Sequence, residues 1–243
     1  MKSRILLTVW VLVLFPAALF GGSKKAPGQT VDSGTFAIFV AGRRVATEKF
    51  QIQQSPEESS ASSELRLEDG SKGGQRAEMQ LSPRGDLVKY KWSEFGSGNA
   101  QAVVEPQNEF LVERVAASES QKAAERSFLL PTSTLILEDY FFSHREILLW
   151  RYLASQCSPN AQGQKGCPMT RSQFGVLVPR QQNSQMVSVE YAGKETTTIR
   201  GAQQELNRFN MQVEGVEWVF WLDEQYKVQR ILIDSEKVEV VRE

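Results

Sequence analysis

Apolar and polar side chains alternate with a period of two along most of this chain, and this pattern constrains the fold more than any other feature. Leu65 and Leu67 alternate with charged residues, and the same period runs through residues 36–40, 77–81 and 87–92. Successive side chains of a strand point to opposite faces of a sheet. These four segments are therefore predicted to be strands with one buried face and one wet face.

Residues that favour turns separate these strands, often at intervals of about 10–12 residues, which is typical of an antiparallel meander. The separating segments are 41–42, 55–63, 69–74, 83–85 and 96–98. Segment 55–63 is polar and is predicted to be a hairpin loop. Residues 109–130 are predicted to add two more strands, although 116–126 fits a helical turn or two equally well.

The second half of the chain returns to strands after Pro168. The predicted strands are 174–178, 186–192, 196–200, 206–213, 216–222, 226–233 and 238–241. Residues 216–222 are apolar on both faces apart from Glu217. This indicates a central strand that is covered on both sides.

One segment, Asp139 to Ser155, is predicted to be a long helix with Asp139 as its N-cap. Its apolar surface is too broad for a helix on the outside of a protein; the residues that form it are Tyr140, Phe141, Ile147, Leu148, Trp150, Tyr152 and Ala154. We therefore expect a mainly β fold: a curved antiparallel sheet, an open or half barrel, wrapped around one long α-helix.

The N-terminus has the pattern of a secretory signal peptide. Lys2 and Arg4 precede an apolar run from Ile5 to Phe20, and Gly21-Gly22-Ser23 offers a cleavage site. The run is shorter than the roughly 20 residues of a spanning helix. An uncleaved anchor stays open, because the cleavage site is not a clean A-x-A and two lysines follow it.

The predicted organisation is a signal peptide or anchor at 1–23, a flexible linker at 24–33 and a single β-rich domain at 34–243. We expect export, to the bacterial periplasm or cell envelope, because the signal is plain and the chain has no N-x-[ST] acceptor for glycosylation. Contact with a membrane is expected only through the N-terminal segment, if it is not cleaved. The oligomeric state does not follow from the sequence.

The charge balance argues against a nucleic-acid partner. The chain carries 28 basic and 29 acidic residues. Loss of Lys2 and Arg4 with the signal leaves 26 basic residues against the same 29 acidic ones. Nucleic-acid binding requires a clustered basic face, and the sequence contains no such cluster.

Cys157 and Cys167 are the only two cysteines, and they flank a polar, glycine-containing segment. In an oxidising compartment a disulfide that closes this loop is the expected state. By the chain-entropy estimate, closing so short a loop contributes roughly 2–3 kcal/mol of stability. A redox pair favours C-x-x-C spacing, and a zinc site requires more ligands than this pair and the distant His144 supply.

No catalytic motif appears in the chain, so we predict no catalytic residues, no metal and no cofactor. His144 lies in the predicted helix beside bulky residues and is expected to be a hydrogen-bonded core histidine. The carboxylate pairs Glu57-Glu58 and Asp223-Glu224 lie in predicted turns. A carboxylate pair assembled from different strands stays open.

Aromatic residues cluster in the C-terminal strands, where they either fill the core or leave an apolar pocket in an incompletely closed sheet. On the second interpretation a lipid or a lipoprotein is the expected partner. The residues predicted to line such a pocket are Tyr140, Phe141, Leu148, Trp218, Phe220 and Trp221.

Three stretches carry a resemblance to a known group: Ala41-Gly42-Arg43-Arg44-Val45, the run from Thr134 to His144, and Trp221-Leu222-Asp223. Over residues 33–243 the chain resembles uncharacterised exported bacterial proteins with a domain of unknown function. Their arrangement is similar to the open β-barrels of periplasmic lipoprotein carriers. The chain departs from those carriers in having one predicted helix where they have several helical segments.

Three functions therefore remain in competition. The first is a non-enzymatic envelope protein that binds an apolar ligand, such as a lipid or an acyl chain, in an open barrel. The second is an assembly or scaffold protein whose barrel is filled by its own helix. The third is a hydrolase that uses carboxylates inside the barrel. A cavity of at least about 300 Å³ would favour the first. A buried acidic cluster around His144 would favour the third.

Overall fold

The computed structural model describes residues 28–70, 72–96, 98–118, 120–159 and 165–243. The predicted signal peptide and residues 24–27 of the predicted linker lie outside the described residues. Within those residues, no helix combines the length and the apolar character that crossing a membrane requires.

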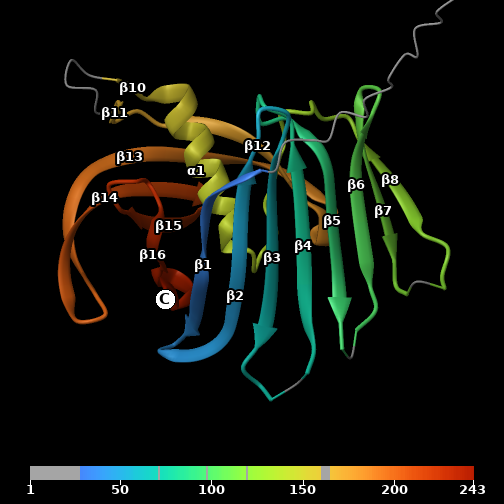
Figure 1. Ribbon diagram of the computed structural model, residues 1–243, viewed down its shortest axis with the longest axis horizontal. Coiled ribbons are helices and arrows are strands. Elements are labelled where there is room, and N and C mark those ends of the chain that lie inside the picture. Colours follow the sequence, from blue (N-terminus) through green and yellow to red (C-terminus); the bar gives the residue numbers. More distant parts are fainter. Residues whose placement is uncertain (1–27, 71, 97, 119, 160–164) are drawn as a thin grey trace, which may run out of the picture.

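The described chain forms one curved, open sheet of 15 strands, in the order β8-β7-β6-β5-β4-β3-β2-β1-β17-β16-β15-β14-β13-β12-β9 (Figure 1). The first arm comprises β1 (Gln29–Val40), β2 (Arg43–Gln54), β3 (Ser59–Leu67), β4 (Gly74–Leu81), β5 (Leu87–Phe95), β6 (Gln101–Gln107), β7 (Phe110–Ala116) and β8 (Ala124–Phe128). The second comprises β9 (Leu135–Ile136), β12 (Ser172–Val178), β13 (Asn183–Ile199), β14 (Ala202–Val213), β15 (Val216–Leu222), β16 (Val228–Ile233) and β17 (Val238–Arg242).

The two arms join where the first and last strands of the sheet pair. β1 is antiparallel to β17, with Phe36 opposite Arg242 and Val40 opposite Val238. Every other pairing in the sheet is also antiparallel except that of β9 with β12. The predicted fold class, a curved antiparallel sheet around one long helix, is confirmed.

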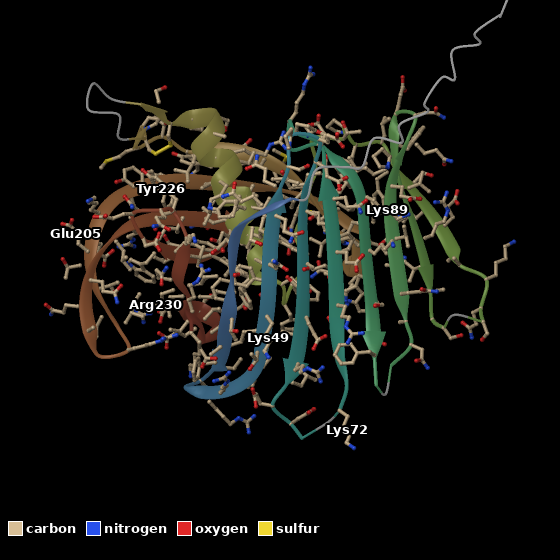
Figure 2. All side chains as sticks on the ribbon, viewed as in Figure 1. Lys49, Lys72, Lys89, Glu205, Tyr226 and Arg230 are labelled. Atoms are coloured by element: carbon tan, nitrogen blue, oxygen red, sulfur yellow. A yellow bond between two sulfur atoms is a disulfide. The ribbon has the colours of Figure 1, made fainter. Side chains whose placement is uncertain are left out.

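The sheet curves around α1 (Phe142–Gln156), which lies between the two arms (Figure 1). Ten of its residues are buried, among them all six from Phe142 to Ile147. On β2, alternate residues such as Phe50 face this interior, whereas Lys49 lies on the outer face (Figure 2). The alternation in the sequence thus separates a helix-facing side of the sheet from a solvent-facing side.

The helix begins three residues later than predicted, and Asp139 is not its N-cap. The N-cap is Phe141, which makes no capping bond through its side chain. The Asp139 carboxylate instead accepts hydrogen bonds from the Gln181 amide, at 3.1 and 3.0 Å. A helix start without a local cap leaves orphan backbone N–H groups that need another acceptor.

Glu48 of β2 supplies that acceptor from across the interior. Its carboxylate accepts bonds from the backbone N–H of Phe142 at 2.7 Å and of Ser143 at 3.3 Å, and from the Ser143 hydroxyl at 2.7 Å. Ser63 of β3 lies 2.8 Å from the same hydroxyl. A carboxylate also suits the positive end of the helix dipole. Glu48 therefore fixes the start of α1 to the first arm.

A second buried group fixes the helix to the junction of the arms. Asp32 of β1 lies 2.6 Å from Arg242 of β17 and 3.2 Å from Lys227. Glu146 of α1 lies 3.7 Å from Arg242 and accepts the Val228 N–H at 3.2 Å. Burial opposes ionisation of Asp32, but its bond from Arg242 leaves the pKa below the ordinary value. Burial, followed by the Asp32 charge, raises the pKa of Glu146.

The C-terminal end of α1 carries the cysteine loop. Cys157, the C-cap residue, is joined to Cys167 in a disulfide. The short strands β10 (Ser158–Pro159) and β11 (Lys165–Gly166) pair within the loop. Nearby, the Tyr152 hydroxyl reaches the carbonyl oxygens of Pro168 and Thr170 at 3.2 and 3.4 Å. The helix end is therefore attached to the segment that leads into β12.

Several predicted boundaries are wrong, because strand pairing extends beyond the local alternation. Residues 29–33, predicted to be linker, belong to β1. The predicted loop 55–63 is shorter, since β3 begins at Ser59. β13 joins the predicted strands 186–192 and 196–200 into one strand that ends at Ile199, with a register shift between Tyr191 and Gly193. The described residues of segment 116–126, which are 116–118 and 120–126, contain no helix, and β8 begins at Ala124.

Cover on the outer face of β15 is limited to a small cluster. Trp221 packs there with Ile199 and Leu206. Glu217 is exposed and Val219 is half-buried. Val219 also packs against this cluster, so β15 is covered on its outer face at Val219 and Trp221 and is open at Glu217, the residue that the expectation excepted.

Replacement of Glu48 by alanine tests the anchoring of α1. Glu48→Ala leaves the donors of Phe142 and Ser143 without their carboxyl acceptor. We expect the free energy of unfolding in urea to fall by about 2–4 kcal/mol. Glu48→Gln, which keeps one acceptor oxygen, is expected to lose less. Glu78→Ala, at an exposed position of β4, is the control and is expected to stay within about 0.5 kcal/mol. Equal stability of Glu48→Ala and Glu78→Ala would contradict this role.

Candidate ligand cavity

A cavity of about 1060 Å³ lies inside the sheet, beside the N-terminal end of α1. Strand ends and turns from both arms surround it, together with the segment before the helix. Its apolar lining comprises Ile38, Val40, Ala41, Val45, Ala46, Leu65, Leu67, Leu137, Tyr140, Phe142, Val178, Val213, Val216, Trp218, Ile233 and Val238. The helix thus fills one part of the interior and leaves this part empty of side chains.

The cavity has an inner end, lined by buried residues, and a rim, lined by residues that are exposed to solvent. Ile38, Leu65 and Leu137 are buried. Leu67 and Tyr140 are 47% and 52% exposed. Large apolar side chains that meet solvent at the mouth of an apolar cavity are a common feature of small-molecule sites. An elongated apolar ligand could therefore reach from buried contacts out to the rim.

Arg145 is the one buried charged residue among those that line the cavity, and it is only 5% exposed. Its Nη1 donates to the carbonyl oxygens of Glu138 and Phe141, at 2.5 and 3.2 Å. Its Cζ lies 4.5 Å from the centre of the Trp218 ring. Burial lowers the pKa of Arg145 to about 10, so the side chain stays protonated at neutral pH.

The other charged lining residues lie nearer the rim. Arg43, Glu214 and Glu236 are exposed. Asp139 is half-buried and bonded to Gln181, which also lines the cavity. Exposed charges are well solvated and screened by salt, so their influence on a ligand is weaker than that of a buried charge.

The six residues predicted to form a pocket do not form one site. Tyr140 and Trp218 line the cavity. Phe141, Leu148 and Phe220 are fully buried in the main core cluster. Trp221 lies in the small cluster on the other face of β15. The aromatic residues of the C-terminal strands are therefore mostly core.

Arg145 was missed by the sequence reasoning, although a signal for it was present. It stands four residues after Phe141 and four before Leu149, so it shares their face of the helix. Both of these neighbours are fully buried. An arginine in the middle of an apolar helix face has to meet a polar partner or a cavity, because an isolated buried charge is costly.

Two buried carboxyl groups, those of Glu113 and Glu138, lie near Tyr90, whose ring packs against His144, the residue around which the hydrolase hypothesis requires acidic groups. The Glu138 N–H donates to Nδ1 of His144 at 3.5 Å, and the Tyr90 ring packs edge-on against the imidazole. Burial, followed by the charge of Glu138, raises the pKa of Glu113 to about 7. Burial likewise raises the pKa of Glu138 to about 7 and lowers that of His144 to about 3.

This acidic cluster, Tyr90, Glu113, Glu138 and His144, is separate from the cavity, since none of its members lines it. Both carboxylate oxygens of Glu113 and the Tyr90 hydroxyl are buried without a hydrogen-bond partner among the described residues. Oε1 of Glu138 accepts the Arg180 N–H at 3.0 Å. Within the described ranges, no group of three or more His, Cys, Asp or Glu residues is arranged to hold a metal ion.

No protein-family model matches the chain, and no curated protein sequence does so. Among solved structures, the chain is similar to a β-barrel-like protein of the domain of unknown function DUF1849 from Brucella abortus. The likeness covers 87% of this chain and 94% of that one, with a TM-score of 0.51 and 9% sequence identity. It confirms the predicted resemblance to a barrel-like domain of unknown function at the level of the fold.

The raised pKa values of Glu113 and Glu138 predict stability that depends on pH. A carboxyl group whose pKa is higher in the folded state stabilises the fold at low pH, and this contribution is lost as the pH rises through its folded-state pKa. We expect the free energy of unfolding to decrease between pH 5 and pH 8. Glu113→Gln, which cannot ionise, should reduce that decrease, and the exposed Glu78→Gln should not. Urea titrations at several pH values measure the free energy of unfolding. Equal pH dependence in Glu113→Gln and in the unaltered protein would contradict the prediction.

Proposed function

We propose that this protein is a non-enzymatic binding protein of the bacterial cell envelope that holds the apolar chain of a lipid or an acylated partner in its open barrel. The observation that carries the proposal is the cavity of about 1060 Å³ beside α1. Small-molecule sites commonly measure about 300–1,000 Å³ and combine an apolar lining with a few polar groups. The cavity is as large as the upper end of this range and combines a mainly apolar lining with a few polar groups.

The lining favours a flexible apolar chain over a compact polar ligand. Aliphatic side chains come from both arms, and 16 of the 24 described residues that line the cavity are apolar. Of the eight polar or charged ones, Arg145 is buried, Gln75, Asp139 and Gln185 are half-buried, and the others are exposed. Burial of an apolar chain contributes about 0.8 kcal/mol for each CH₂ group, so even part of an acyl chain supplies substantial binding energy. Location in the envelope is supported by the signal-like N-terminal pattern alone.

A catalytic role has less support, because the carboxyl groups that sequence reasoning sought lie outside the cavity. A general acid or base has to come within hydrogen-bond reach of its substrate. A ligand in the cavity would not meet Glu113 or Glu138, since neither residue lines it. Their burial beside Tyr90 and His144 is better explained as part of the packed interior.

The scaffold function remains a second candidate because of one observation, the depth at which the helix is buried. Phe141 and Leu148 are fully buried against the sheet, and Trp150 donates from Nε1 to the Tyr226 carbonyl at 2.7 Å. A helix held in this way fills its part of the barrel permanently. The two candidates differ in whether the remaining cavity binds ligand, which can be measured directly.

Two bulky substitutions in the lining test the binding function. Val216 and Val238 both line the cavity and are half-buried. In the double variant Val216→Trp/Val238→Trp, two indole rings occupy cavity space, and we expect the affinity for the neutral fluorescent probe N-phenyl-1-naphthylamine to fall at least about tenfold, equal to about 1.4 kcal/mol.

The matched control places the same side chains outside the cavity. Val88 and Leu129 are exposed and do not line it. Val88→Trp/Leu129→Trp is expected to bind the probe as the unaltered protein does. If the probe binds saturably, and binds the lining variant as tightly as the unaltered protein, the ligand site lies outside the cavity. Absence of binding to the unaltered protein would favour the scaffold function.

A further inference from the structure

We propose that Arg145 selects the ligand class: the cavity binds amphiphiles through a single anionic group, a carboxylate or a phosphate, seated on the Nε–Nη2 edge of this arginine, with the apolar chain directed to the rim. The inference rests on the proposed function and adds to it the identity of the headgroup and the orientation of the ligand.

The guanidinium of Arg145 has a buried donor that makes no hydrogen bond to the described residues. Nη1 is used by two backbone carbonyl groups, those of Glu138 and Phe141. Nε is buried and has no hydrogen-bond partner among the described residues. Nε and Nη2 form the side of the guanidinium that binds carboxylate or phosphate through two parallel hydrogen bonds. The edge suited to an oxyanion thus includes a buried donor, Nε, that the described residues leave without a partner.

The guanidinium is also held in place before any ligand arrives. The two carbonyl groups fix Nη1, and the Trp218 ring stacks below Cζ at 4.5 Å. The Phe142 ring lies 5.5 Å from Cζ. An arginine oriented in this way loses little conformational freedom when it binds an anion, which increases affinity and specificity.

The carboxylates nearest to Arg145 are engaged with other partners. Glu48 accepts the donors at the start of α1. Asp139 accepts both of its bonds from Gln181, and Oε1 of Glu138 accepts the Arg180 N–H. Within the described ranges, no carboxylate lies within salt-bridge distance of Arg145. The charges of Asp139, Glu48 and Glu138 compensate the burial of Arg145 only in part, since its pKa still lies below the ordinary value, so an anion in direct contact would offset the remaining cost.

The distribution of the other charges gives the orientation. Two carboxylates, Glu214 and Glu236, and one arginine, Arg43, stand exposed at the rim, so the exposed rim charges are net negative and disfavour an anionic group there. The apolar rim residues Leu67 and Tyr140 suit the far end of a chain. An anionic amphiphile therefore has its best contacts with the headgroup inward at Arg145 and the tail at the rim.

Competition by three ligands with the same 12-carbon chain tests whether the cavity prefers an anionic headgroup. Dodecanoate, dodecyl phosphate and dodecanol would each be titrated against bound N-phenyl-1-naphthylamine on the unaltered protein. A hydrogen-bonded charged group predicts that at least one of the two anions competes roughly 10- to 100-fold better than the alcohol. The stronger anion distinguishes a fatty acid from a phosphate-bearing lipid as the source of the headgroup.

Substitutions assign the preference to one residue. Arg145→Met should reduce the anion-to-alcohol ratio to about one while probe binding persists, and Arg145→Lys, which keeps charge without the planar fork, should give an intermediate ratio. Arg43→Met removes the other lining arginine, which is exposed, and should keep the full ratio.

The competition results distinguish failure of the headgroup inference from failure of the proposed binding function on which it rests. If dodecanol competes as well as both anions on the unaltered protein, the headgroup inference is overturned and the binding function stands. If no 12-carbon ligand and no probe binds, the binding function itself fails. If Arg145→Met does not fold, the ratio on the unaltered protein decides the headgroup preference, and the ratio on Arg145→Lys decides its assignment to Arg145. A ratio that Arg145→Met leaves intact would overturn the assignment to Arg145.

Discussion

The bond between Glu48 and the first turn of α1 is the interaction on which the rest of the structure depends. A helix inside an open sheet has to bury its N-terminal donors, and those donors need an acceptor that folding brings to them. Glu48 provides it from β2, with the Ser143 hydroxyl and Ser63 completing the contact. One turn further along the helix, Glu146 meets the Asp32–Arg242 pair where β1 and β17 join the two arms. The helix is thus held between the arms, and the sheet is held open around it.

The cavity follows from this arrangement. A sheet of this size encloses more space than one helix of 15 residues can fill, and the fixed start of α1 determines which part stays empty. The same fixed start places Arg145 at the edge of the empty part, one turn into the helix. A buried arginine is then tolerated because two carbonyl groups and an aromatic face support it. The polar group that would recognise a ligand is therefore a consequence of how the helix is anchored.

The sequence allowed prediction of what depends on local pattern, and not of what depends on distant contacts. Alternation with period two identified most strands, and the broad apolar face of 139–155 identified a helix inside a curved sheet. The helix start was misplaced because its acceptor, Glu48, lies 94 residues from Phe142 in the chain. The pocket was misassigned for a similar reason. Phe141, Leu148 and Phe220 fill the core, whereas the lining comes from strand ends of both arms, whose adjacency depends on the pairing of β1 with β17.

The central claim is that the space beside α1 is a ligand cavity with its anion site at Arg145. A crystal structure of the protein with 12-bromododecanoate tests it most directly, because anomalous scattering locates the bromine at the end of the chain. The account predicts a bromine peak at the rim, near Leu67 and Tyr140, with the carboxylate on the Nε–Nη2 edge of Arg145. A bromine peak on the outer face of the sheet, or a carboxylate at the rim with the bromine beside Arg145, would contradict it.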